Sequence, residues 1–473
     1  MMEKILTNKN KSFFWLLLYI LFWSLVPCIL RNSLPLDTVE AISWGHEWQM
    51  SYNKHPPLSA WIAEIFFLAM GSFGLYFLST LCITIALYFV KKTSDLLFFN
   101  SKNNIPYYLF LLSPVFSIYA VEFNVNILLI PLISASIYFY LLSITKNEAK
   151  YWILLAVFST LCVLAKYTSI LFIGIFFIHS IFYANAIKNW KFYLSGAIFL
   201  MLLTPHLIWL YNNDFITIKY AMARSVNTQN NRIYQALLTF CGEMFLLLPI
   251  LPLLIVKRLK FNKEALSLNF VKFICVLPLF VFPLYALVTG NSTKTMWSII
   301  CCIFIGLIFQ ERKNIVNIII ILNIIYAGMY SLITAFRPFT RSDFDSEKFV
   351  EIVNSDAKLT YENDSKNIYV AGEIWLGSII NVYHKKRPSF FINANEEENA
   401  WFTLDKQNDF PKSAIIVVAN SESEMNKFIK KVSKYKSISS VEIKDYNYCK
   451  VQEKDFVFKF KKCKPEKVLY TVL

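Results

Sequence analysis

The sequence lacks several patterns that mark common protein classes. Its nine cysteines show none of the close spacings of a zinc site, and seven lie in or near apolar runs, where a thiol behaves as a small hydrophobe. No internal repeat is visible, which weakens the case for a transporter built from inverted repeats. Glycine is also scarce, with 11 of 473 residues. These absences leave a strongly apolar chain whose few polar clusters carry most of the information.

Two further absences concern the N-terminus and the charge. The first apolar run, 13–30, has no small-residue cleavage site and is followed by more such runs, so it is not a cleavable signal peptide. The formal net charge is +15, but most Lys and Arg occur in short clusters between apolar runs or are scattered near the C-terminus. We therefore interpret this charge as a determinant of membrane topology, not as a nucleic-acid-binding surface.

Apolar residues dominate the chain and come in long runs. Hydrophobic residues make up 56% of the sequence and aromatic residues 17%. Several runs approach the ~20 residues that cross a hydrocarbon core, and polar loops separate them. The sequence therefore predicts a polytopic α-helical membrane protein.

Basic clusters set the predicted orientation. Lys4, Lys9 and Lys11 precede the first run, which favours a cytoplasmic N-terminus. If the later clusters are also cytoplasmic, the short segment 58–71, which contains Glu64, is an interfacial or re-entrant helix on the outer face. About eleven crossings remain. They are expected near 12–30, 75–90, 106–120, 127–144, 151–165, 169–184, 192–210, 237–256, 271–289, 296–309 and 314–336.

The chain changes character after residue 336. We expect residues 1–336 to form the transmembrane domain, with a first outer loop at 31–74, and residues 337–473 to form a small soluble α/β domain outside. Strand-like runs at 367–370, 414–419 and 455–461 and a helical pattern at 421–434 support this expectation. The domain shows no catalytic motif, so a lid, an acceptor platform and a structural appendage all remain open. Cys449 and Cys463 could pair if it is exported.

Unusual polar side chains gather in the first outer loop. Asp37 and Glu40 are three residues apart, so a helix starting there would place both carboxylates on one face. An N-cap role for Asp37 is the competing interpretation. The same loop carries Trp44, Lys54 and His55.

The other predicted outer loops add cations and amides. Lys166 sits in a short turn between two apolar runs, where snorkelling to the surface is the ordinary role of a lysine. Cations near carboxylates suit an anionic ligand together with an acceptor that must lose a proton. The candidate site residues of these loops are Glu122, Asn124, Asn126, Lys166, Tyr167, Arg224 and Lys294.

Two stretches of the first outer loop resemble a known family. Residues 36–41 read LDTVEA, and residues 54–61 read KHPPLSAW. They resemble the first extracytoplasmic loop of the bacterial branch of the GT-C membrane glycosyltransferases, related to protein O-mannosyltransferases and lipid A aminoarabinose transferases (glycosyltransferase families 39 and 83). Residues 165–168 (AKYT) and 204–209 (TPHLIW) resemble later motifs of this branch in the same order. The resemblance covers about residues 12–310.

The resemblance implies a function. A GT-C enzyme of this branch would take a sugar from a polyprenyl phosphate, here expected to be undecaprenyl phosphate. It would transfer the sugar, with inversion, to a hydroxyl or phosphate on the periplasmic face of the bacterial inner membrane. Lipid A, another envelope glycan, a lipid or a protein would serve as acceptor.

The resemblance also assigns roles to residues. Asp37 would be the catalytic carboxylate, with Glu40 beside it. A base of this kind activates a hydroxyl acceptor, while cations stabilise the charge that grows on the leaving phosphate. The expected phosphate contacts are Lys166, Arg224, Lys294, His55 and Lys54. The expected substrate contacts are Glu122, Asn124, Asn126, Tyr167 and Trp44.

Two departures from the family pattern refine this expectation. Aminoarabinose transferases have a lysine directly before the Pro-Pro pair, where this chain has His55, and this argues against aminoarabinose as the sugar. Many relatives carry an acid where this chain has Asn126, which leaves a hydrogen-bonding group in place of a charge.

Alternative readings remain open at this point. No cofactor is predicted; a divalent metal held by His46, His55, His206 and Glu40 is possible but not indicated by their spacing. A transporter, flippase or polymerase of lipid-linked glycans is the main alternative function. A membrane scaffold whose exported tail binds a partner is a further one.

Overall fold

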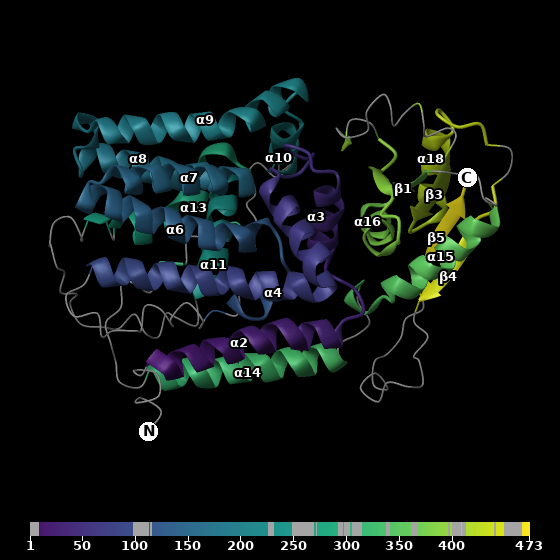
Figure 1. The fold of residues 1–473 in the computed structure, drawn as a ribbon, viewed down its shortest axis with the longest axis horizontal. Coiled ribbons are helices and arrows are strands. Elements are labelled where there is room, and N and C mark those ends of the chain that lie inside the picture. Colours follow the sequence, from purple (N-terminus) through teal and green to yellow (C-terminus); the bar gives the residue numbers. More distant parts are fainter. Residues whose placement is uncertain are drawn as a thin grey trace. The chain divides into compact units, whose positions relative to one another are not determined.

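The chain is mainly helical, with one five-stranded sheet formed by C-terminal residues (Figure 1). The structure is a computed structural model. The residues it describes are 9–97, 113, 116–225, 231–247, 269–270, 272–291, 297, 303–304, 315–336, 341–360, 367–395, 398–399, 408, 413–438, 441–448 and 466–473.

The chain divides into two compact units that are not contiguous in sequence. The first comprises Met1–Leu25, Tyr76–Tyr211 and Ile218–Tyr330, and the second comprises Val26–Leu75, Asn212–Thr217 and Ser331–Leu473. The first outer loop therefore groups with the C-terminal residues. The predicted domain boundary after residue 336 instead assigns this loop to the transmembrane domain.

Most predicted spans within the described residues are helices. They are α2 (Lys9–Leu30), α4 (Leu58–Leu97), α6 (Val125–Lys146), α7 (Ala149–Ala165), α8 (Ser169–Phe182), α9 (Trp190–Asn212), α11 (Arg232–Leu247), α13 (Pro278–Thr289) and α14 (Ile315–Phe336). Helix α10 (Ile216–Ser225) lies in a predicted outer loop. Short turns of helix occur at Tyr119–Val121, Ala186–Lys188 and Lys272–Val276. The predicted spans 106–120 and 296–309 lie largely outside the described residues.

Three of these helices are long and apolar enough to cross a membrane. Within the described part of the chain, α4, α6 and α9 meet this criterion by length and composition, whereas α7, α8 and α13 are apolar but shorter. Helices α2 and α14 lie side by side, and Trp23 on α2 packs edge-on against Tyr330 on α14 with ring centroids 5.3 Å apart (Figure 1). The helical fold is as predicted, and the number of crossings stays a prediction.

Helix α4 consists of two helical segments joined at Gly71. This residue has φ 58° and ψ −150°, a conformation that glycine adopts far more readily than any residue with a Cβ. The first segment of α4 therefore ends at residue 71, where the sequence predicts the end of a separate helix. Its position at the membrane surface remains a prediction.

The sheet in the second unit has strand order β2-β1-β3-β5-β4. Its first three strands in this order are parallel, while β5 runs antiparallel to both β3 and β4. The strands are β1 (Ile368–Gly372), β2 (Ser389–Ile392), β3 (Ala414–Ala419), β4 (Lys444–Tyr448) and β5 (Glu466–Val472). The associated helices are a short 3-10 turn at Arg341–Asp343, α15 (Ser346–Thr360), α16 (Ile374–Tyr383) and α18 (Glu422–Val432).

Successive side chains of the central strand β3 point to opposite faces of the sheet, and this alternation explains how α18 packs on it. Ile415 and Val417 face a core that includes Met425 and Phe428 of α18. The Ser421 hydroxyl caps α18 by accepting the backbone N–H of Glu424 at 3.3 Å. The predicted strands 367–370 and 414–419 and the predicted helix 421–434 are therefore present. The predicted strand 455–461, Cys449 and Cys463 lie outside the described residues.

Helix α3 (Leu36–His46) also belongs to the second unit, where it packs against α16. It makes a close crossing with the first segment of α4 at Gly45. A Cβ at Gly45 would lie 2.2 Å from the backbone oxygen of Ala60 and 2.6 Å from Cβ of Glu64. Glycine is therefore required here by the close approach of two helices.

Gly45→Ala should destabilise the second unit by about 1–3 kcal/mol, because overpacking forces the two helices apart. Thermal unfolding of the purified protein in detergent, followed by tryptophan fluorescence, would show a lower transition temperature. Gly196→Ala on α9 is the matched control, since a Cβ there meets no atom within 4 Å. An unchanged transition in the Gly45 variant would contradict the close crossing.

Candidate active site

Asp37 lies in the first turn of α3, one residue after the helix begins. The N-cap position is Pro35, and the cap makes no side-chain hydrogen bond, so the N-cap interpretation of Asp37 is wrong. The Asp37 side chain is exposed. A carboxylate in the first turn interacts favourably with the positive end of the helix dipole. The position leaves this carboxylate accessible to a reactant.

Glu40 lies one turn further along α3 and is buried. Its side chain is 3% exposed and forms an ion pair with the Lys54 ammonium, which donates a short hydrogen bond to Oε1. The Lys54 side chain is itself only 14% exposed. Two predicted site residues that are 14 positions apart thus form one buried pair. The pair holds the segment after α3 against the helix.

Aromatic rings surround this pair. The Trp44 ring stacks on Tyr52 with centroids 5.6 Å apart, and the Lys54 ammonium lies 5.7 Å from the centroid of Trp44. His55 meets the edge of Trp44 at 6.1 Å. The structure therefore brings together Glu40, Trp44, Lys54 and His55, all of them predicted site residues.

A remote residue anchors the same segment. The Thr217 hydroxyl donates to the backbone oxygen of Tyr52 at 2.6 Å and lies 3.1 Å from the Ser51 hydroxyl. Thr217 belongs to Asn212–Thr217, which groups with the second unit. These bonds fix the backbone beside Lys54.

The surroundings change the acidity of Glu40. Burial raises the pKa of this carboxyl, and the Lys54 ammonium opposes that shift. The negative charges of Asp37 and Glu373 raise the pKa further. The Asp37 carboxylate is therefore near enough to Glu40 to affect its pKa, and both lie on one helix, three residues apart.

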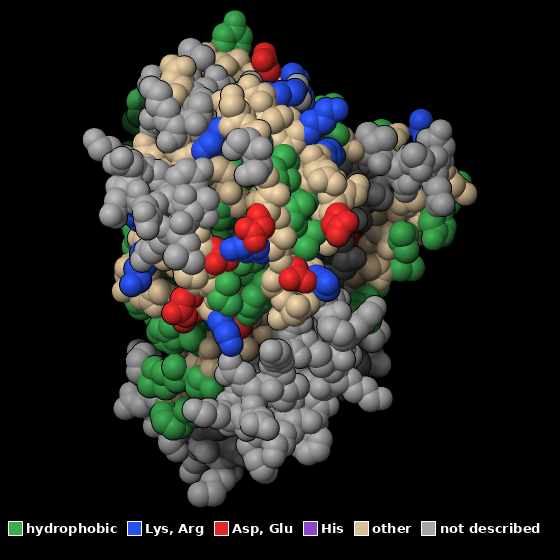
Figure 2. Space-filling model, turned by 90° about the vertical axis from the view of Figure 1, so that its right-hand side faces the viewer, with side chains coloured by type: hydrophobic (Ala, Val, Ile, Leu, Met, Phe, Trp, Pro, Cys, Tyr) green, Lys and Arg blue, Asp and Glu red, His purple; other side chains and the backbone are tan. Residues whose placement is uncertain are grey.

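Glu373 is a neighbour that sequence reasoning missed. It caps α16 by accepting the backbone N–H of Leu376 at 2.9 Å, and burial raises its pKa. Nearby, the Arg341 guanidinium lies 5.3 Å from the ring centroid of Trp375. On the face in Figure 2, acidic and basic side chains lie close together near the centre, and Lys and Arg side chains prevail in the upper part.

In the sequence, Glu64 stands out only as an acid within an apolar segment. Its side chain is 1% exposed and contacts both Arg387 and His46. A lone acid in an apolar helix is a detectable signal, because such a charge requires a partner. The identity of the partner, more than three hundred residues away, has no signal in the sequence.

Lys166 and Asn126 form a second buried contact, within the first unit. Lys166 follows the last residue of α7, is 7% exposed, and donates a short hydrogen bond to Oδ1 of Asn126. Its ammonium also lies 5.3 Å from the ring centroid of Trp297. Snorkelling to the surface is therefore the wrong interpretation of Lys166. Asn126 accepts a hydrogen bond from Lys166, and its predicted contact with substrate stays a prediction.

Asn124 has a structural role next to this contact. Its side chain caps α6 by accepting the backbone N–H groups of Asn126 and Ile127, at 2.9 and 3.3 Å. Glu122 is half-buried and ends the preceding short helical turn. Their predicted contacts with substrate stay predictions.

The two later motifs of the predicted family contact each other. The Tyr167 hydroxyl lies 2.9 Å from Nε2 of His206, which is buried within α9. Arg224 belongs to α10, with its side chain outside the described part, and Lys294 lies entirely outside it.

The predicted alternative of a metal site has no matching cluster. In the described part of the chain, no group of three or more His, Cys, Asp or Glu side chains is arranged to hold a metal ion. His46 contacts Glu64, His55 packs on Trp44, and His206 contacts Tyr167.

A protein family and two solved structures are similar to this chain. Residues 54–209 match the family model of dolichyl-phosphate-mannose-protein mannosyltransferase. No curated protein sequence matches the chain.

Solved structures share the fold. The structure of ArnT from Cupriavidus metallidurans bound to undecaprenyl phosphate has a TM-score of 0.63 at 12% identity, covering 98% of each chain. The apo state of the same protein gives a TM-score of 0.60 at 10% identity, again over 98% of each chain. The predicted resemblance to the GT-C membrane glycosyltransferases is therefore confirmed, in sequence over residues 54–209 and in fold over nearly the whole chain.

Proposed function

We propose that this protein transfers a sugar from a polyprenyl-phosphate-linked donor to an acceptor on the periplasmic face of the bacterial inner membrane. The observation that carries the proposal is the match of residues 54–209 to a lipid-phosphate mannosyltransferase family. That segment contains Lys54, His55, Lys166 and Tyr167. The shared fold with a protein crystallised with undecaprenyl phosphate supports undecaprenyl phosphate as the lipid carrier.

Asp37 is the proposed catalytic base. It removes the proton of an acceptor hydroxyl as the acceptor oxygen attacks the anomeric carbon of the sugar. The bond from that carbon to the phosphate oxygen breaks, and the lipid phosphate leaves with the bonding electrons. This single displacement inverts the configuration. The leaving group is already a stable anion, so no general acid is needed. A phosphate acceptor would attack without this proton transfer.

Cations stabilise the charge that grows on the departing phosphate. Lys54 suits this role because Glu40 holds its ammonium in one place beside Trp44. Lys166 suits it because Asn126 fixes its ammonium. His55, Arg224 and Lys294 complete the proposed set of phosphate contacts.

The sugar and acceptor are proposed only as classes. The histidine directly before the Pro-Pro pair argues for a sugar other than aminoarabinose. Lipid A, another envelope glycan, a lipid or a protein offers a suitable hydroxyl or phosphate. In the proposed topology, the N-terminus is cytoplasmic and residues 337–473 are periplasmic.

Mass spectrometry of envelope lipids and glycoproteins would test the function directly. Cells that contain the protein should carry a glycosylated species that disappears when the protein is removed and returns when it is restored. Identical profiles in both strains would contradict transferase activity.

Asp37→Asn should lower transfer about 10²- to 10⁴-fold, the range lost with a general base, while membrane insertion stays intact. The measurement is sugar transfer from a synthetic polyprenyl-phosphate donor by purified protein. Asp214→Asn is the matched control, because Asp214 is also an exposed aspartate, and its positive φ of 51° is one that asparagine tolerates. Normal transfer by the Asp37 variant would refute the assignment.

The rate of transfer should fall as the pH decreases, with a midpoint above the ordinary glutamate pKa of about 4.3. The reason is that burial raises the pKa of Glu40, so this carboxyl takes up a proton at a higher pH than an ordinary glutamate. Its protonated form no longer holds the Lys54 ammonium as an ion pair.

Glu40→Gln isolates this effect, because the amide oxygen still accepts a hydrogen bond but no longer titrates. For this variant we expect a lower rate of transfer, and we expect the fall in rate at acidic pH (the acid limb of the pH profile) to occur at a lower pH. An acid limb at the same pH in this variant and in the wild type would show that another group controls it.

A further inference from the structure

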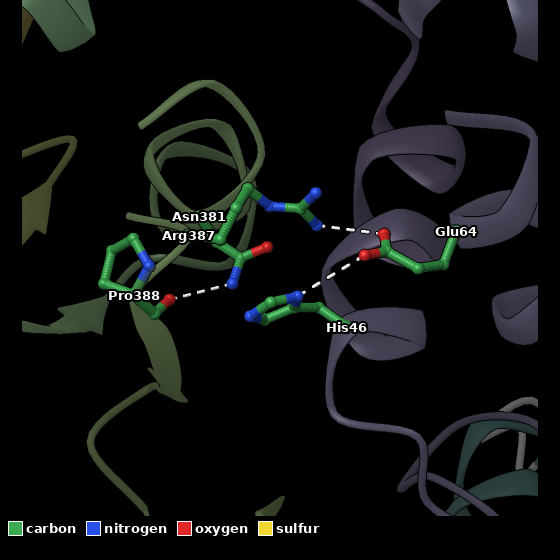
Figure 3. A network of polar contacts seen from close by, with 5 residues as sticks. All are labelled: His46, Glu64, Asn381, Arg387 and Pro388. Carbon is green, nitrogen blue, oxygen red and sulfur yellow. Dashed lines mark hydrogen bonds and ion pairs between the residues drawn. The ribbon is translucent and has the colours of Figure 1, made fainter. Parts of the chain in front are cut away.

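Glu64 is a buried charge that the proposed chemistry does not use. It lies within the first segment of α4, and its side chain is 1% exposed. An unpaired carboxylate in such a place is strongly unfavourable. The carboxylate is instead bound from two sides (Figure 3). Arg387 donates to Oε2 at 3.0 Å, and Nδ1 of His46 lies 3.4 Å from Oε1.

The turn that carries Arg387 is held in one conformation. Arg387 has a positive φ of 46°, and its backbone N–H donates to the oxygen of His384 at 2.9 Å. Asn381 at the end of α16 donates to the backbone oxygen of Pro388 at 2.8 Å (Figure 3). The guanidinium also lies 5.1 Å from the ring centroid of Phe67 on α4. Arg387 therefore reaches Glu64 from a fixed base between α16 and β2.

The other partner of Glu64 connects this contact to the candidate active site. His46 is the last residue of α3, whose first turn carries Asp37. Gly45, beside His46, makes the close crossing with Ala60 and Glu64. The helix has only 11 residues, so a displacement at its C-terminal end also moves its N-terminal end.

We propose that Arg387 is a positioning residue for the transfer reaction. Through Glu64 and His46 it sets the position of α3, and hence of Asp37 and Glu40, without touching substrate. The inference rests on the proposed function in one respect, namely that the carboxylates of α3 take part in transfer. It gives the C-terminal sheet region a specific role, in contrast to a lid or a structural appendage.

The test compares Arg387→Gln with Lys386→Gln in the full-length protein. Lys386 is the neighbouring residue and its side chain is exposed, so its variant is the matched control. Hydrogen exchange of residues 36–46 and steady-state kinetics with a polyprenyl-phosphate sugar are both measured. We expect faster exchange in α3 and a fall in kcat of about ten- to a hundredfold in the Arg387 variant, with little change in the donor KM.

Two more variants address coupling and folding. Arg387→Lys keeps the positive charge and should therefore have a higher kcat than Arg387→Gln. Glu64→Gln keeps the shape of the side chain and should reproduce the Arg387→Gln phenotype. The double variant should be no worse than either single variant, because both act through one contact. Glu64→Gln also replaces Arg387→Gln as the test variant if the latter does not fold.

The outcomes separate the inference from the proposed function. Unchanged exchange in α3, or unchanged kcat despite faster exchange, overturns the positioning role. If exchange increases in α3 but Asp37→Asn retains full transfer, the contact through Arg387 stands and the catalytic assignment fails. An additive double variant would show that Glu64 and Arg387 act separately, and would also overturn the inference.

Discussion

The ion pair between Glu40 and Lys54 is the interaction on which the candidate active site depends. Both charges are largely removed from water, and burial of either one alone would be strongly unfavourable. The segment after α3 must therefore fold back so that the ammonium reaches the carboxylate. Once it does, Trp44 stacks on Tyr52, and His55 lies against Trp44. The ion pair thus acts together with the hydrogen bonds of Thr217 to fix the shape of the loop.

The same requirement recurs at other buried charges. Glu64 is neutralised by Arg387 and contacts His46, and Lys166 is held by Asn126. Such contacts stabilise the fold only weakly, but they fix side chains in one geometry, since loss of a partner leaves an uncompensated charge. This property is useful in an enzyme that must orient charged groups around a phosphate. Among these fixed charges, Lys54 and Lys166 are proposed phosphate contacts, and Glu64 is proposed to act through the position of α3.

Local patterns were predictable where neighbouring residues control the structure. The break at Gly71, the helix that begins before Asp37, and the strand 414–419 all follow from short-range preferences. Prediction failed where a distant contact decides. Lys166 does not extend to the surface, because Asn126, 40 residues away, provides a buried partner for its ammonium. The N-cap prediction failed for a local reason, since Pro35 occupies that position and α3 begins at Leu36.

The sequence by itself determined that the chain is a helical membrane protein resembling the GT-C glycosyltransferases, since apolar runs and short motifs are local properties. It also pointed to Glu40 and Lys54 as candidates. Only the tertiary structure decided that they pair with each other, that the first outer loop groups with the C-terminal residues, and that Arg387 reaches Glu64. The physical reason is that a buried charge requires a partner but does not specify it, because chain folding alone brings distant residues together.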